Sequence, residues 1–187
     1  MKKSVFTLLL LLAVSAQSAI LVGDDSSGWG GTTNSGIQSS SGDSIHHEPD
    51  TGECYQATAS GTAVTAHVLI SDWPTATQAK IVVYLASTRA KLAESAVVSS
   101  AGGTGERTAS ISVSITSGLR YCLVLMANGY VDTVNRTGST FQTSSLALNF
   151  ATPDDPLPAA NVGNTLQFSV WLESADTSGL LLRRRRS

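Results

Sequence analysis

The 187-residue sequence contains only 14% charged residues and is rich in Ser, Thr, Gly, Ala and Val, a mixture that favours strands and turns over helices. Two of its 12 basic residues lie at positions 2–3 and four at Arg183–Arg186, whereas all 14 acidic residues follow position 19. The body in between carries six basic and 14 acidic residues, a net charge of −8, so we expect no nucleic-acid binding by the folded domain.

Residues 1–19 have the organisation of a secretory signal peptide. Two lysines precede the apolar run Val5–Val14, and small residues follow it, so cleavage is expected after Ala16, Ser18 or Ala19. This run is too short for a lasting membrane anchor, and no later stretch is apolar for long enough to span a bilayer. We therefore expect a secreted protein, extracellular or periplasmic, without a transmembrane segment.

Residues 20–52 are expected to form a flexible arm. Asp, Ser, Gly and Thr dominate from Gly23 onwards, and Trp29, Ile37 and Ile45 are the only large apolar residues there. Such a stretch buries too little apolar surface to offset the entropy lost on ordering. At most one strand is expected in it, at Ile20–Val22.

The densest group of potential metal ligands lies at the end of this arm and comprises His46, His47, Glu48, Asp50 and Glu53. The His-Glu-x-x-His spacing of zinc proteases is missing, because position 51 is Thr. A solvated polar loop is the favoured interpretation, and we predict no metal ion and no cofactor.

Cys54 and Cys122 are the only cysteines. In an oxidising compartment such a pair more often forms a disulfide than a metal or redox site, and the alternative is two separate buried thiols. Closing a loop of about 68 residues would stabilise the fold by about 4 kcal/mol in the chain-entropy model.

Residues 53–174 are expected to form an all-β, jelly-roll-like antiparallel β-sandwich. Short segments that alternate between apolar and polar residues, or are apolar throughout, are separated by Gly, Pro, Asn or Ser turns. These segments are 64–70, 81–85, 111–115, 119–126, 146–150 and 166–172. Asn128-Gly129 predicts a hairpin, because both residue types tolerate positive φ.

Five segments in this region resemble a diffuse family of jelly-roll, carbohydrate-binding-like modules of bacterial exported proteins and phage virion proteins. They are Val83–Ser87, Lys91–Ser95, Ile115–Leu125, Pro156–Ala159 and Phe168–Trp171. The resemblance covers about 110 residues and implies packing roles: Gly118 would make a tight turn, and Tyr121 would bury its ring with its hydroxyl near the edge. It implies the fold more strongly than a function, because sandwich scaffolds host many activities.

No catalytic signature is found, and we predict that the chain is not an enzyme. A Gly-x-Ser-x-Gly nucleophile elbow is missing, and His67, on a predicted strand, is the only histidine outside the arm. Carboxylates that could pair for glycoside hydrolysis are Asp72, Glu94, Glu106, Asp132 and Glu173. Charged residues spread sparsely over strand edges usually serve solubility.

Trp73, Tyr130 and Trp171 are the candidates for stacking on a sugar ring, with Asp132 and Asn135 as polar neighbours of Tyr130. Trp171 is expected on the opposite face of its strand from the apolar residues beside it. Packing is the competing interpretation for all three rings, because large aromatic residues often close the ends of a small sandwich.

Residues 175–187 form a separate tail, in which three leucines precede Arg183–Arg186. It could tether the protein to an anionic surface, serve as a sorting or processing signal, or be a disordered end without a role.

These features lead to two hypotheses. The first is a secreted non-catalytic module for adhesion or carbohydrate recognition, with a glycan or cell-surface polysaccharide as its partner. The second is a structural or decoration subunit of an extracellular assembly or virion, which self-assembles through exposed strand edges.

Overall fold

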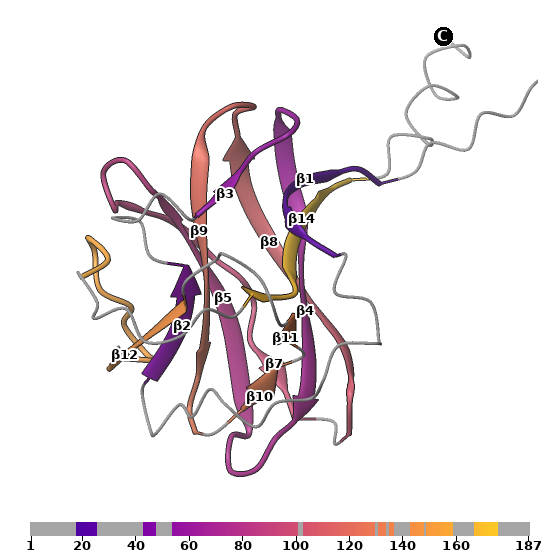
Figure 1. The fold of residues 1–187 in the computed structure, drawn as a ribbon, viewed down its shortest axis with the longest axis vertical. Helices are drawn as coiled ribbons and strands as arrows, with labels where there is room; N and C mark the ends of the chain where they lie inside the picture. Colours follow the sequence, from indigo (N-terminus) through magenta and orange to yellow (C-terminus); the bar gives the residue numbers. More distant parts are fainter. Residues whose placement is uncertain are drawn as a thin grey trace, which may run out of the picture.

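The computed structural model describes residues 18–25, 43–47, 54–100, 103–129, 131–133, 135–136, 143–147, 149–158 and 167–175. Within these ranges every regular element is a β-strand (Figure 1), which confirms the predicted all-β class. The same ranges contain no helix long and apolar enough to cross a membrane.

The strands form two antiparallel sheets, and the first of them is sheet A. Its order is β1 (Ile20–Asp24), β14 (Val170–Ser174), β4 (Gly61–Asp72) and β8 (Gly105–Ile115), and the short β10 (Asp132–Thr133) pairs with the end of β4. Strand β8 alternates buried apolar and exposed polar side chains along its second half, as the sequence predicted for residues 111–115.

Sheet B lies opposite, at the left in Figure 1. The order is β12 (Thr143–Ala147), β2 (Asp43–His47), β9 (Arg120–Ala127), β5 (Gln78–Leu85) and β6 (Lys91–Glu94). Two short strands extend it: β3 (Tyr55–Gln56) pairs with β9, and β7 (Val98–Ser99) pairs with β5. A separate pair joins β11 (Asn135–Arg136) and β13 (Gln167–Phe168).

The connectivity is that of a jelly roll. If the eight principal strands (β1, β2, β4, β5, β6, β8, β9 and β14) are numbered 1 to 8 along the chain, sheet A has the order 1-8-3-6 and sheet B the order 2-7-4-5. Strand 1 thus pairs with strand 8, 2 with 7, 3 with 6 and 4 with 5. This set of pairs defines the double-sheet jelly roll.

The main core lies between the sheets and is filled by the inward-facing side chains of both. Two tyrosines stabilise it with their hydroxyl groups: Tyr55 donates to the carbonyl of Phe168 on β13 (3.0 Å), and Tyr121 accepts from the amide of Thr116 (2.8 Å). Gly118, with φ of +86°, makes the tight turn before β9.

A second core covers the outer face of sheet B. The segment 149–158 lies over β5 and β9, and its Leu157, 1% exposed, packs with Tyr84, Val124 and the disulfide-bonded Cys122. Tyr84 donates a hydrogen bond to the carbonyl of Asp154 (2.9 Å). We call residues 149–158 the covering segment; it explains why β9 is apolar on both of its faces.

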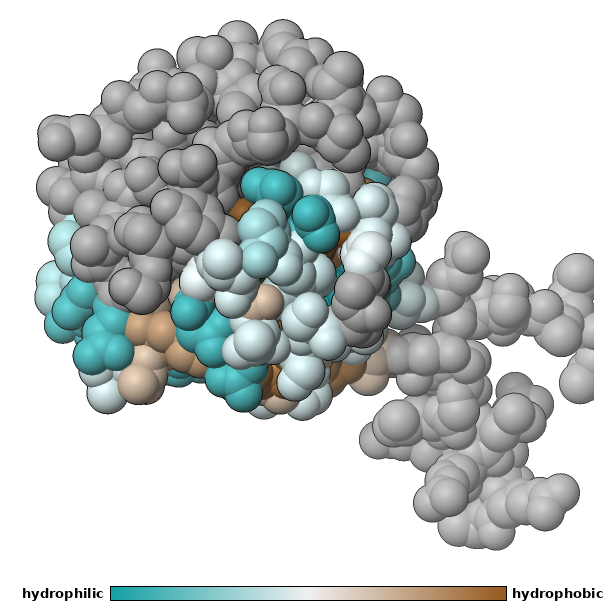
Figure 2. Space-filling view, turned by 90° about the horizontal axis from the view of Figure 1, so that it is seen from below, coloured by the Kyte–Doolittle hydropathy of each residue, from teal (hydrophilic) through white to brown (hydrophobic). Residues whose placement is uncertain are grey.

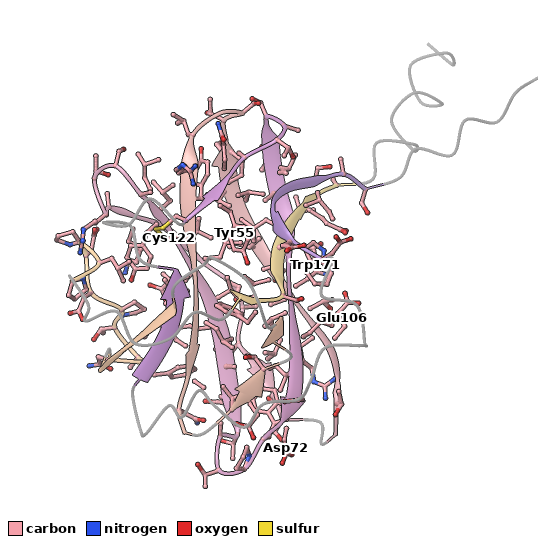
Figure 3. All side chains as sticks on the ribbon, in the orientation of Figure 1. Tyr55, Asp72, Glu106, Cys122 and Trp171 are labelled. Carbon is pink, nitrogen blue, oxygen red and sulfur yellow. A yellow bond between two sulfur atoms is a disulfide. The ribbon has the colours of Figure 1, made fainter. Side chains whose placement is uncertain are left out.

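The predicted disulfide is present in the structure. Cys54 and Cys122 are bonded, their Cα atoms lie 4.7 Å apart, and both residues are fully buried. Figure 3 shows Cys122 on the side of β9 that faces the second core.

The structure differs from the sequence prediction in two places. The strand allowed at Ile20–Val22 of the expected arm is present as β1, with Leu21 and Val22 buried in the main core, but residues 43–47 form a second strand, β2, that was not expected. Residues 26–42 and 48–52 of the arm lie outside the described residues. Asn128-Gly129 does not form a hairpin, because β9 belongs to sheet B and β10 to sheet A, so the chain crosses between the sheets here.

Candidate functional site

Charged and aromatic side chains from three strands of sheet A converge on its outer face. Alternation along each strand directs His67 on β4, Glu106 on β8, and Trp171 and Glu173 on β14 away from the main core. We call these four residues the outer-face cluster. Figure 3 shows Trp171 and Glu106 on the right-hand side of the body, where sheet A is turned away from sheet B.

The imidazole ring of His67 is the centre of this cluster. Its Nδ1 lies 2.6 Å from Oε1 of Glu106, and its Nε2 lies 3.4 Å from Oε2 of Glu173. The indole of Trp171 stacks on the imidazole, with ring centroids 4.8 Å apart and planes inclined by 9°. Register explains the contact, because Trp171 is the direct partner of His67 in the β14–β4 ladder.

Glu173 is held by two further donors. The indole Nε1 of Trp171 donates to its Oε1 (3.2 Å), and the hydroxyl of Ser18 donates to its Oε2 (2.9 Å). Ser18 and Ala19 precede β1, and the amide of Ser174 donates to the carbonyl of Ala19 (3.0 Å). The beginning and the end of the described chain therefore meet at this cluster.

The cluster combines covered rings with accessible carboxylates. His67 is 8% exposed and Trp171 7%, whereas the side chain of Glu106 is 42% exposed and that of Glu173 22%. Ile20 and Leu69 pack against Trp171 as a small apolar patch. The cluster can therefore accept hydrogen bonds from a ligand or attract a cation, but it does not offer a bare aromatic face.

Trp73 does not fit the predicted sugar-stacking role. It follows β4 as expected, but its ring lies in the main core and is only 8% exposed. Of the two tryptophans among the candidates, Trp171 alone lies on an outer sheet face. The position of Trp73 agrees with the competing packing interpretation, and Trp171, 7% exposed, is covered to a similar extent.

Asp132 lies at the other end of the sheet, away from the outer-face cluster. It is the partner of Asp72 in the β10–β4 pair, and burial, together with the negative charge of Asp72, raises the pKa of Asp132 above its ordinary value. Figure 2, which looks at this lower end, shows mostly hydrophilic and pale residues in the described part. Tyr130 and the side chain of Asn135 lie outside the described residues.

A further charged group has a structural role. The ammonium of the buried Lys80 lies 2.7 Å from Oε2 of Glu94 and 5.1 Å from the ring centroid of Phe150 in the covering segment. Burial alone would raise the pKa of Glu94, but hydrogen bonds from Lys80 and Lys91 outweigh it and lower the pKa. Lys91 also donates to the carbonyl of Pro153 (3.3 Å), so these charges fix the covering segment to sheet B.

Other predicted sites lie largely outside the described chain. The side chains at His46 and His47 and the whole of 48–53 are not described, and neither is the tail beyond position 175. In the part that is described, no group of three or more His, Cys, Asp or Glu side chains is arranged to hold a metal ion.

Sequence reasoning named Trp171, His67, Glu106 and Glu173 separately but did not bring them together. The available signal was their position: each is polar or amphipathic at an outward position of a strand whose inward positions are apolar. Their convergence depends on the order β14-β4-β8, which follows from the jelly-roll pairing of distant strands rather than from local pattern.

The fold and this cluster define the class: an all-β jelly-roll sandwich with one disulfide and a polar cluster on one outer sheet face. Comparison with protein-family models, with curated protein sequences and with solved structures finds no match.

Proposed function

We propose that this chain is an exported, non-catalytic module for adhesion or carbohydrate recognition, and that it meets its ligand with the outer face of sheet A. The observation that carries the proposal is the outer-face cluster, where three strands bring two accessible carboxylates to one place. The buried disulfide supports export, because such bonds persist in oxidising compartments.

We choose the outer face of sheet A as the ligand-binding face because the outer face of sheet B is covered. The covering segment buries the outer face of sheet B, whereas sheet A presents exposed polar side chains along β8. These are Glu106, Thr108, Ser110, Ser112 and Ser114. Hydroxyls and carboxylates in a row suit a polyhydroxylated ligand, because each can exchange hydrogen bonds with sugar hydroxyls.

Affinity at such a site should be low. Without an exposed ring, binding would rest on hydrogen bonds that contribute about 0.5–1.5 kcal/mol each, and about 1.5–3 kcal/mol where a carboxylate accepts. A few such bonds, less the cost of ordering the ligand, correspond to a Kd of about 1 mM. Adhesion would then depend on several copies acting together on one surface.

The test is binding of the protein, displayed in many copies on beads, to a panel of immobilised glycans. We expect the Glu106→Gln variant to lose most of the binding, because the amide removes the charge that strengthens hydrogen bonds from sugar hydroxyls. The control is Asp72→Asn, a matched change of an exposed carboxylate at the lower end of the sheet, which should bind as well as the parent. Equal binding by both variants, or no binding to any glycan, would contradict the proposal.

Assembly through strand edges is the second candidate, and one observation favours it. Leu92 lies on β6 and is 42% exposed, and Val97 directly precedes β7 and is 47% exposed. Strands β6 and β7 form one edge of sheet B. Exposed apolar side chains beside a strand edge can pair with a neighbouring molecule.

The described edges, however, carry features that oppose pairing. The amide of Thr58 donates to the carbonyl of Leu21 on β1, and the amide of Ala96 donates to the carbonyl of Ser110 on β8. Strand β6 has four residues and bears the charged Lys91 and Glu94. We therefore expect a monomer in size-exclusion chromatography with light scattering; a defined oligomer that binds no glycan would favour the assembly hypothesis.

A further inference from the structure

The imidazole of His67 lies between two carboxylates, and this arrangement raises a question of hydrogen bonding. An ionised carboxylate can only accept hydrogen bonds, so the 2.6 Å contact with Glu106 requires the proton on Nδ1. A ring whose single proton is on Nδ1 turns its Nε2 lone pair towards Oε2 of Glu173, 3.4 Å away. Nε2 of His67 and Oε2 of Glu173 then repel each other, unless a cation lies between them or a second proton is bound to Nε2.

The burial of this nitrogen strengthens the argument. His67 is 8% exposed, and its Nε2 is a buried polar atom without a hydrogen-bond partner among the described residues. Leaving a buried polar atom unpaired costs about 1–3 kcal/mol. A cation bound by Nε2 and Oε2 would remove both this cost and the repulsion.

We propose that Nε2 of His67 and Oε2 of Glu173 form a divalent-cation site that suits Zn²⁺ or Cu²⁺. Imidazole nitrogen selects such metals over Mg²⁺ and Ca²⁺, which prefer oxygen ligands. In a tetrahedral zinc site, bonds of about 2.0–2.2 Å place two ligand atoms about 3.4 Å apart. The separation of 3.4 Å between these two atoms matches that spacing.

Each of the two ligands is oriented by a hydrogen bond to a neighbouring side chain, as is usual for ligands in metal sites. Glu106 accepts from Nδ1 of His67, so a ring with a single proton carries it on Nδ1 and keeps Nε2 open to a metal ion. Trp171 donates from Nε1 to Oε1 of Glu173, which leaves Oε2 directed at His67. Glu106 and Trp171 are thus positioning residues, and the stack of Trp171 on His67 holds the ring in place.

Two protein ligands make a weak site with open positions. Solvent or a ligand's hydroxyl would complete the coordination, and the hydroxyl of Ser18, 2.9 Å from Oε2 of Glu173, adds a third oxygen only in a chain cleaved after Ala16. This inference does not depend on carbohydrate recognition, because metal binding is measured with the metal alone.

The experiment uses the full chain with His46→Ala and His47→Ala, which removes the other two imidazoles and leaves His67 as the only histidine. Imidazole ¹⁵N NMR at pH 7.5 is recorded with and without ZnCl₂. We expect a proton on Nδ1 and a free Nε2 before zinc, and a shift confined to Nε2 after it. A ring already protonated at both nitrogens and unchanged by zinc would overturn the proposal.

Calorimetric titration with ZnCl₂ tests the ligands separately. His67→Gln and Glu173→Gln should each weaken binding at least tenfold, and Glu106→Gln should weaken it about 10–100-fold as a positioning residue. Glu94→Gln, which lies on sheet B, serves as the control and should bind as the parent does. Unchanged binding in the two ligand variants would contradict the site; if either variant fails to fold, the NMR result on the parent still decides.

Discussion

Gly23 shows how one residue fits β1 against β14. Its φ of +109° lies in the region that favours glycine, and a Cβ atom built there would collide with the carbonyl of Val170 and with Cα and Cβ of Trp171. The missing side chain allows the first strand to lie close against the strand that carries Trp171 and Glu173.

Gly23→Ala should therefore destabilise the protein by about 1–3 kcal/mol, because both the strained φ and the overlap with Trp171 must be relieved. The measurement is the free energy of unfolding in urea. Gly61→Ala is the matched control on the neighbouring part of sheet A: its nearest neighbours would be methyl groups of Leu21 at 3.4 and 3.5 Å, so it should change stability little. Equal effects of the two changes would contradict this account of Gly23.

The raised pKa of Asp132 predicts that its effect on the stability of the protein depends on pH. Burial and the charge of Asp72 raise the pKa of Asp132 in the folded state. The carboxyl group therefore makes its full contribution to stability below the pKa of the unfolded chain, about 3.9, and this contribution is lost as the pH rises through the pKa of the folded protein. Asp132→Asn should therefore raise the melting temperature at pH 7 and leave it nearly unchanged at pH 3.

A double-variant cycle provides the control for this prediction. If the Asp72 charge is a cause of the raised pKa, the gain from Asp132→Asn should shrink in an Asp72→Asn background. A lower melting temperature for Asp132→Asn at pH 7 would mean that the carboxylate makes a stabilising contact instead.

At the scale of elements, the covering segment has a larger role than its irregular structure suggests. It seals the outer face of β5 and β9 with Leu157 and closes over Tyr84, whose pKa is raised by burial and by the nearby charges of Asp154, Glu94 and Asp155. Without this cover, a face of sheet B that is apolar throughout its centre would meet water.

Leu157→Ala should cost about 2–5 kcal/mol in the free energy of unfolding, the range found when a large core side chain is removed. Leu119→Ala makes the same chemical change at a residue that is 46% exposed and should stay within about 0.5 kcal/mol of the parent. Similar losses for both would show that the covering segment contributes little to the second core.

The elements that local pattern predicts are those whose own side chains alternate or are buried on both faces. Strand β8 and strand β9 belong to this group, and both were expected from the sequence. Strand β2, Asp43–His47, has Ile45 as its only large apolar residue, and it is a strand because it pairs with β9 and β12. Tertiary pairing thus overrides local propensity where the sequence is polar.

The outer-face cluster escaped prediction for a related reason. His67, Glu106 and Glu173 are far apart along the chain. They are neighbours only because β14 and β8 both pair with β4 in one sheet. Alternation identifies which side of a strand a residue occupies, but it does not identify the neighbouring strand.

For the whole molecule, the jelly-roll order makes residues 20–24 and 43–47 part of the body, as β1 and β2. A chain that begins at Glu53 lacks β1 and β2. It loses the burial of Leu21 and Val22, about 1.5–3 kcal/mol each, and leaves one side of β14 unpaired, while β9 keeps only β3 on the side where β2 lies. We expect this fragment to melt at a much lower temperature than a chain that begins at Gln17, or to remain unfolded, as measured by circular dichroism. Equal melting temperatures would mean that both strands are peripheral.

The pairing of β1 with β14 also determines how the body would respond to mechanical load. Because the two strands are antiparallel and Ile20 is the partner of Glu173, the chain enters and leaves the sheet at the same end (Figure 1). A stretching force between the two ends therefore acts across the ladder and opens its hydrogen bonds one after another, starting at Ile20 and Glu173, rather than shearing them together. Once β1 and β14 have peeled away, the bond between Cys54 and Cys122 stops extension of the 68-residue loop, so the centre of the module would stay intact under a load that had already unfolded its edges.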